Sequence, residues 1–140
     1  MRHRKSTRRL NYKPQLARMM TRDLVTSLLL YESIRTTQKR AKAIQPIVDK
    51  LITAARNKSV TLAIRHINAV VTDKNACRKI MEVFKPRYAK RTSGLTRIVA
   101  VGARLGDGAK MVDLTMMDRE VPVEKAGKAE KKTTSASSKK

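Results

Sequence analysis

Positive charge dominates this sequence and limits the folds open to it. The chain of 140 residues carries 33 Lys plus Arg against 11 Asp plus Glu, so its formal net charge is +22. So many positive charges repel one another in a compact fold, and solubility alone needs a net charge of only about 2–8 in magnitude. The composition therefore predicts that the chain binds a polyanion such as nucleic acid.

The basic residues are spread over the whole chain, which divides into three segments. Residues 1–13 hold six cations and no acid and lack apolar periodicity, which is typical of an extended arm. A mitochondrial presequence is the alternative interpretation, but the segment is short and uniformly polar for an amphipathic helix. We expect residues 14–118 to form a globular body and residues 119–140, rich in Lys, Ala and Ser, to form a disordered basic tail.

Apolar residues are numerous enough for a core but include few aromatic side chains. They make up 41% of the chain, and the aromatic residues are Tyr12, Tyr31, Phe84 and Tyr88. No run approaches the roughly 20 apolar residues of a membrane span, so the sequence predicts no contact with a membrane. The single cysteine, Cys77, has no partner for an internal disulfide and fits a reducing compartment.

Pro14 suits the first turn of a helix, and the residues after it have helical periodicity. This helix is expected to begin half-exposed and to end buried on all sides. One of its faces carries Leu16, Met20, Leu24, Ser27 and Tyr31.

Three further helices follow from capping residues and apolar stripes. Thr36 or Thr37 is expected to cap a helix that Pro46 kinks or splits. Ser59 and Asp73 are expected to cap helices at roughly 60–71 and 74–85. The last of these is predicted to bury Ile80, Val83 and Phe84.

Three β-rich runs are predicted to form strands, at residues 33–37, 95–101 and 111–117. In the last run, apolar residues at 112, 114 and 116 alternate with Asp113 and Thr115, as in a sheet with one solvated face. The turn residues Gly106, Asp107 and Gly108 lie between the last two runs and predict a β-hairpin.

No pattern of catalysis or metal binding is found. His3, His66 and Cys77 lack the spacing of metal ligands. Basic neighbours can lower the pKa of Cys77, but a packing role explains this residue better than nucleophilic catalysis. The glycine-containing loop at 102–110 joins two strands and lacks the phosphate-loop pattern, so we discount it. Carboxylates are scattered, and the sequence predicts no catalytic residue, metal, cofactor or small-molecule substrate.

A basic segment with one aromatic residue connects the last helix to the next strand. It contains Lys85, Arg87, Tyr88, Lys90, Arg91 and Arg97. Arginine donates two parallel hydrogen bonds to a phosphate and tyrosine stacks on unpaired bases, so this segment is suited to binding RNA. The alternative is a solvated charged loop.

Several motifs in order resemble the bacterial large-subunit ribosomal protein L17 family. The resemblance begins with Met1-Arg2-His3-Arg4-Lys5-Ser6 and ends at Asp118-Arg119. The matches between these ends are Ile34-Arg35-Thr36-Thr37, Ala41-Lys42, Leu51-Ile52-Thr53-Ala54-Ala55, Pro86-Arg87-Tyr88-Ala89, Gly94-Leu95-Thr96-Arg97-Ile98 and Gly106-Asp107. Leu95 stands where the family usually has an aromatic residue, and the segment from Ser59 to Asn75 matches poorly.

The resemblance implies an α+β fold, with four or so helices packed on a small mixed or antiparallel sheet, and no catalysis. The implied partners are 23S rRNA and neighbouring large-subunit ribosomal proteins, in a cytoplasmic ribosome. Phosphate contacts are expected to dominate, so RNA shape would set specificity more than base identity. The expected RNA-binding residues are Arg2, His3, Arg4, Lys5, Arg8, Arg9, Lys13, Arg18, Arg22, Arg35, Lys39, Arg40, Lys42, Arg87, Tyr88, Lys90, Arg91 and Arg97.

Two other function classes are compatible with the charge. A nucleoid-type protein that compacts DNA needs similar basicity, but it would usually show dimer-forming features or a major-groove helix, and neither is evident. A basic nuclease would need a constellation of histidine or carboxylate residues, which the sequence lacks.

Overall fold

The computed structural model of the chain describes residues 10–118. Most of the predicted arm and all of the predicted tail lie outside the described residues, so the expectations for residues 1–9 and 119–140 stay predictions.

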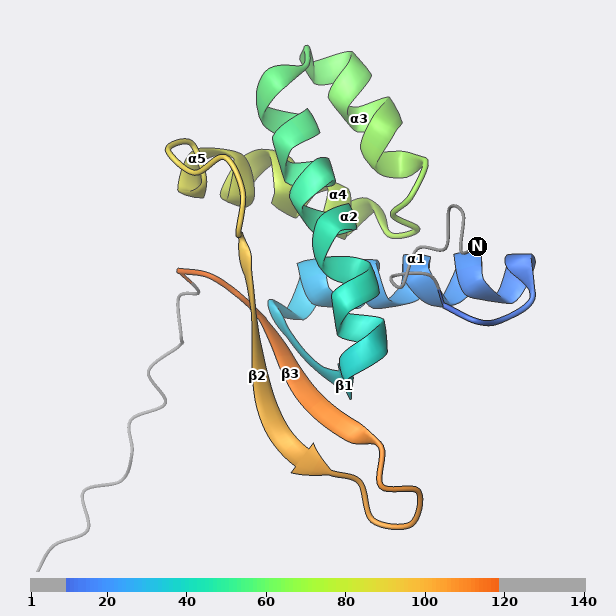
Figure 1. The fold of residues 1–140 in the computed structure, drawn as a ribbon. Helices are drawn as coiled ribbons and strands as arrows, with labels where there is room; N and C mark the ends of the chain where they lie inside the picture. Colours follow the sequence, from blue (N-terminus) through green and yellow to red (C-terminus); the bar gives the residue numbers. More distant parts are fainter. Residues whose placement is uncertain (1–9, 119–140) are drawn as a thin grey trace, which may run out of the picture.

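The described part of the chain is an α+β fold, as expected (Figure 1). Helices α1 and α2 flank the first strand, and two further strands follow the remaining helices. The elements in chain order are α1 (Pro14–Tyr31), β1 (Ser33–Thr37), α2 (Gln38–Asn57), α3 (Val60–Asn68), α4 (Lys74–Lys79), the π-helical turn η1 (Ile80–Phe84), α5 (Lys85–Arg87), β2 (Thr96–Ala103) and β3 (Lys110–Met116).

The sheet is antiparallel throughout and has the strand order β1-β3-β2. Leu114 at its centre lies opposite Ile34 on one side and Ile98 on the other. The predicted alternation along β3 is confirmed, because Val112, Leu114 and Met116 are buried. The predicted hairpin of β2 and β3 is also confirmed, with an irregularity at Gly102 whose φ of 147° suits glycine.

Helix α1 begins at Pro14 as predicted, but the apolar face found in the sequence is not its buried face. Leu16 is 49% exposed and Tyr31 is 68% exposed, whereas Val25, Leu28 and Leu29 are fully buried. The first half of α1 projects past α2 in Figure 1. The expectation that the end of this helix is buried on all sides is wrong, because Tyr31 lies on the side away from the core.

Helix α2 contacts all three strands and α1, and it contributes the largest share of the core. It runs unbroken through Pro46, so the predicted split does not occur. Its apolar stripe is buried as predicted, including Ile44, Val48, Leu51 and Ile52.

The capping predictions are only partly correct. Thr37 and Ser59 occupy the N-cap positions of α2 and α3, but neither side chain makes a capping hydrogen bond. Asp73 does cap α4, since its Oδ1 accepts a hydrogen bond from the Asn75 amide at 2.7 Å.

The helical run after residue 74 contains a π-helical turn that the periodicity did not predict. Ile80 and Phe84 are buried as expected, but Val83 is 36% exposed. A π turn adds a residue to the helical repeat. Positions four apart, Ile80, Phe84 and Tyr88, therefore share the buried side, while Val83 is turned toward solvent.

None of the helices described between residues 10 and 118 is long and apolar enough to cross a membrane.

Candidate nucleic-acid interface

Nearly all acidic residues of the described chain are used in internal contacts. Five are in ion pairs with basic residues: Glu32, Glu82, Asp107, Asp113 and Asp118. Asp49 accepts hydrogen bonds from backbone amides and Asp73 caps α4, which leaves Asp23 without such a contact among residues 10–118. The negative charges are thus largely neutralised inside the molecule.

Many basic side chains, by contrast, make no hydrogen bond or ion pair within the described part of the chain. Those with this property are Lys13, Arg18, Lys39, Lys42, Lys50, Lys58, Arg65, Lys74, Lys85, Lys90, Arg97 and Lys110. All but Lys85 are exposed. Their charges are available to a polyanion.

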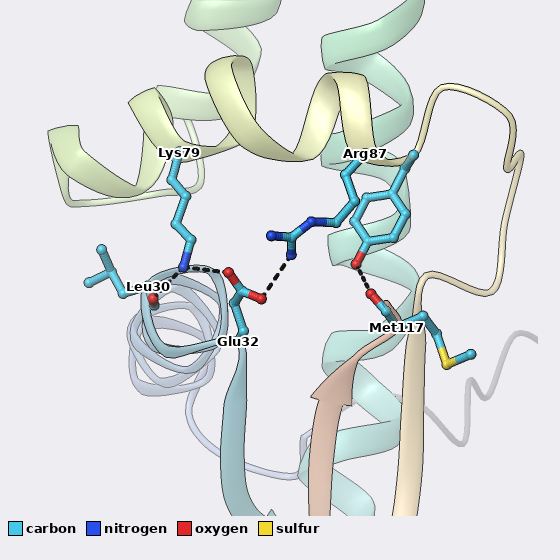
Figure 2. A network of polar contacts seen from close by, with 6 residues as sticks. Leu30, Glu32, Lys79, Arg87 and Met117 are labelled. Carbon is cyan, nitrogen blue, oxygen red and sulfur yellow. Dashed lines mark hydrogen bonds and ion pairs between the residues drawn. The ribbon is translucent and has the colours of Figure 1, made fainter. Parts of the chain in front are cut away.

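The buried Glu32 ties together three elements at one end of the sheet (Figure 2). It follows α1 with a left-handed φ of 60°, and its carboxylate contacts Lys79 Nζ and Arg87 Nη1, each at 2.8 Å. Lys79 also donates to the Leu30 carbonyl at 2.7 Å. Burial alone would raise the pKa of Glu32, but hydrogen bonds from the two cations outweigh it and hold the pKa below its usual range.

This network changes the roles of two predicted RNA-binding residues. The Arg87 side chain is 13% exposed and is bound to Glu32, so it stabilises the fold. The predicted base stacking by Tyr88 is wrong for this conformation, because the residue is 1% exposed and its ring packs 6.0 Å from Phe84. The Tyr88 hydroxyl donates to the Met117 carbonyl, and burial raises the pKa of this phenol.

Besides Arg40, which donates to the Tyr12 hydroxyl, three other predicted residues have internal partners as well as exposure. Arg22 of α1 donates to the carbonyls of Ala69 and Val70, which fixes the end of α3. Arg35 of β1 makes a two-pronged contact with Asp113 across the sheet, at 2.8 and 3.1 Å. Arg91 contacts Asp118 Oδ2 at 3.2 Å. A cation already paired with a carboxylate brings less net charge to a phosphate.

Helix α2 holds the predicted basic segment in place through three polar side chains. Gln45 donates to the Thr96 carbonyl at 3.3 Å, and Asp49 accepts from the Gly94 and Leu95 amides at 3.4 and 3.2 Å. In the last turn of the helix, Arg56 donates to the carbonyls of residues 88, 89 and 91. These contacts orient the exposed Lys90 toward solvent beside α5.

A basic hollow lies where α2 begins. Its volume is about 520 Å³, and it is lined by Leu10, Asn11, Tyr12, Thr37, Gln38, Lys39, Arg40, Arg104, Asp107, Ala109 and Lys110. The predicted pair Lys39 and Arg40 is here joined by Arg104 and Lys110 from the β2–β3 connection. Arg40 donates to the Tyr12 hydroxyl at 3.3 Å.

A second, more open hollow adjoins the first, because Leu10 and Tyr12 line both. Its volume is about 970 Å³, and its wall includes the predicted Arg18 and Arg22 of α1 together with Ala43 and Ile47 of α2. The two hollows flank the point at which residues 1–9 join the described chain.

The predicted residues therefore do not form one continuous site. Lys39, Arg40, Arg18 and Arg22 surround the hollows, whereas residues 87–91 lie toward the opposite end of β2 (Figure 1). Arg35 and Arg97 share the outer face of the sheet, separated by β3, since their register partners on β3 are Asp113 and Thr115. Lys13 and Lys42 are exposed. Arg2, His3, Arg4, Lys5, Arg8 and Arg9 lie outside the described residues.

Arg104 and Lys110 line the basic hollow but were not among the residues predicted from the sequence. They lie 65 and 71 residues from Lys39 along the chain, and only the pairing of β3 with β1 brings them beside it. The structural roles of Lys79 and Arg56 were not predicted either, because only tertiary contacts reveal them.

The structure places Cys77 in the core and His66 on the surface. Cys77 is buried in α4, in agreement with a packing role, and burial raises the pKa of its thiol. His66 is exposed on α3. Among residues 10–118, no group of three or more His, Cys, Asp or Glu is arranged to hold a metal ion.

Comparison with known proteins places this sequence among ribosomal proteins. The family profile described as Ribosomal protein L17 matches residues 20–117. The chain is 40% identical over 120 residues to the large ribosomal subunit protein bL17 of Syntrophotalea carbinolica, covering 86% of this chain and 77% of that protein. It is 38% identical over 120 residues to the bL17 of Pelobacter propionicus, covering 86% of this chain and 94% of that protein.

Proposed function

The chain belongs to the ribosomal protein L17 family, and from this membership we propose that it is a structural constituent of the bacterial large ribosomal subunit. Its role there is to bind and stabilise folded 23S rRNA, next to neighbouring large-subunit proteins, and so to support subunit assembly and translation in the cytoplasm. The observation that carries this proposal is the family match along residues 20–117.

The charge distribution supports a structural role on RNA. Acidic residues are largely paired internally, while unpaired cations are exposed on several sides of the body. Contacts to phosphate depend on such available cations, and each one releases counterions from the RNA.

The proposal assigns different tasks to the three segments. The arm at residues 1–13 binds RNA through Arg2, His3, Arg4, Lys5, Arg8, Arg9 and Lys13. The body at residues 14–118 binds through exposed cations, chiefly Arg18, Lys39, Lys42, Lys90 and Arg97. Arg22, Arg35, Arg40 and Arg91 serve both packing and RNA contact, because each keeps an exposed portion besides its internal partner. The tail at residues 119–140 adds diffuse positive charge.

The test is whether the protein travels with ribosomes. Cell lysate is fractionated on a sucrose gradient after treatment with buffer, DNase or RNase. The expected result is co-sedimentation with the large subunit, kept after DNase and lost after RNase. Release by DNase alone would contradict the proposal and favour the nucleoid alternative.

A further inference from the structure

The basic hollow at the start of α2 is built from three segments that are distant in the sequence. One wall is the stretch from Leu10 to Tyr12, a second is the first turn of α2, and the third is the connection between β2 and β3. The sheet brings this connection to α2, because Thr37 at the end of β1 pairs with Met111 at the start of β3. Figure 1 shows the start of α2 beside this end of the sheet.

The hollow has a strong excess of positive charge. Its wall contains four cations, Lys39, Arg40, Arg104 and Lys110, and one acid, Asp107. Asp107 is bound by Arg104, and this hydrogen bond holds the pKa of Asp107 well below its usual range. Lys39 and Lys110 have no partner among residues 10–118, and the only side-chain contact of Arg40 is the neutral Tyr12 hydroxyl. Three cationic groups are therefore available to an anion in the hollow.

The rim of the hollow also carries an exposed aromatic ring. Tyr12 is 46% exposed, and its hydroxyl accepts a hydrogen bond from Arg40 at 3.3 Å. An exposed ring beside unpaired cations is the arrangement that single-stranded RNA uses, with phosphates on the cations and an unstacked base on the ring. A protein segment would have to supply carboxylates at a matching spacing and has no need of the ring.

We infer that this hollow binds one stretch of RNA backbone, with phosphates at Lys39, Arg40 and Lys110 and a base against Tyr12. The inference rests on the proposed function and adds a defined contact that includes Lys110, which sequence patterns did not assign. RNA seated here lies beside Leu10, next to the basic residues 1–9. Binding at the hollow raises the effective concentration of RNA near those residues, so the two contacts reinforce one another.

The experiment compares two double variants of the full chain with the same net charge. K39Q/K110Q removes the two unpaired lysines of the hollow, and K58Q/K74Q removes two exposed, unpaired lysines that do not line it. Affinity for a large-subunit rRNA fragment is measured over a salt series. The slope of log affinity against log salt should flatten by about 1.4–1.8 for K39Q/K110Q, because each phosphate contact contributes about 0.7–0.9. The control should flatten it by less than half of that.

Equal flattening by the two variants, or no flattening by K39Q/K110Q, overturns the inference. In both cases salt-dependent binding by the wild-type chain leaves the proposed function standing. Absence of RNA binding by the wild-type chain contradicts the proposed function itself. The two failures are thus distinguishable in one data set.

Tyr12 provides an independent arm of the test. Tyr12→Leu removes the ring and should weaken RNA binding roughly tenfold with an unchanged salt slope, since stacking does not release counterions. Tyr12→Phe keeps the ring and should bind within about threefold of wild type, although its bond to Arg40 is lost. Wild-type affinity in Tyr12→Leu would overturn the assignment of a base to this ring.

Discussion

Glu32 is the residue whose structural role departs most from what its place in the sequence indicates. It follows an apolar run in a basic chain, yet it is 8% exposed and binds two cations that come from a different helical segment. Arg87 and Lys79 also lie over the Phe84 ring, at 5.4 and 5.5 Å from its centre. The acid thus allows two cations to pack against the core without an unpaired buried charge.

Replacing Glu32 by Gln should destabilise the fold by about 2 kcal/mol, because the charge-assisted hydrogen bonds to Lys79 and Arg87 lose the negative charge of their acceptor. The matched control is Glu82→Gln, which removes an exposed partner of Arg78 at 4.0 Å and should change stability by less than about 0.5 kcal/mol. Urea unfolding followed by circular dichroism measures both. Similar small losses in the two variants would show that the Glu32 network does not stabilise the protein.

The lowered pKa of Glu32 predicts that the stability of the fold depends on pH. Because this pKa is lowered in the folded state, the ion pairs of Glu32 contribute their full stabilisation above the unfolded pKa of about 4.3. This contribution is lost as pH falls through the lower, folded value. The stability gap between wild type and Glu32→Gln should therefore be constant from pH 7 to about pH 5 and narrow below about pH 4. A gap that stays constant to pH 3 would contradict the lowered pKa.

A substitution at Tyr88 distinguishes a role of this residue in packing from a role in RNA binding. Tyr88→Phe keeps the ring against Phe84 and removes the hydroxyl, which donates to the Met117 carbonyl and also interacts with Arg87. We expect a loss of about 1 kcal/mol in stability and unchanged affinity for rRNA. Unfolding midpoints and rRNA binding are measured on the same preparation. Weaker RNA binding with unchanged stability would restore the stacking role.

At the scale of elements, the sequence predicted structure well wherever a local signal acts alone. Pro14 marked the start of α1 and β-branched residues marked β1, so α1 begins where it was predicted and β1 has its predicted bounds. The hairpin followed from alternation and turn residues. The buried face of α1 and the π turn at Ile80–Phe84 were not predictable in this way, because each depends on which neighbouring element covers the helix.

Arg56 carries a prediction for the segment between α5 and β2. Its Nη1 contacts three backbone carbonyls while its Nε donates to Asn57 Oδ1, and lysine has no second nitrogen with which to keep both contacts. Arg56→Lys should therefore increase amide exchange at residues 88–95 at least about tenfold, while exchange in the middle of α2 stays unchanged. Mass spectrometry of hydrogen exchange resolves the two regions. Equal change in both would indicate global destabilisation instead of a loosened segment.

At the scale of the whole molecule, the sequence predicts a polyanionic partner but not the arrangement of the cations that would bind it. Charge alone indicated a polyanionic partner, and exposed lysines such as Lys39 were among the residues expected. Arginines were harder to assign, because a guanidinium serves equally well as a buried clamp, as at Arg87, or as an exposed phosphate contact. Lys110 joins Lys39 only through strand pairing, which no local pattern encodes.

The segment at residues 1–9 and the tail should differ in their contribution to binding. Residues 2–9 carry five cations and no acid, whereas residues 120–140 carry six cations and three acids. Each phosphate neutralised contributes about 0.7–0.9 to the slope of log affinity against log salt. Deleting residues 2–9 should therefore flatten the slope by about 3.5–4.5 if these cations meet phosphate.

Deleting residues 120–140 should flatten the slope much less, because Glu120, Glu124 and Glu130 offset half of the charge removed. Ordering residues 2–9 on RNA costs on the order of 1 kcal/mol per residue, so the gain in affinity at physiological salt is smaller than the slope alone indicates. The measurement is binding of a 23S rRNA fragment by both truncations over the same salt series. Equal flattening by the two deletions would mean that binding is diffuse attraction between a polycation and RNA, and it would contradict a specific role for the N-terminal segment.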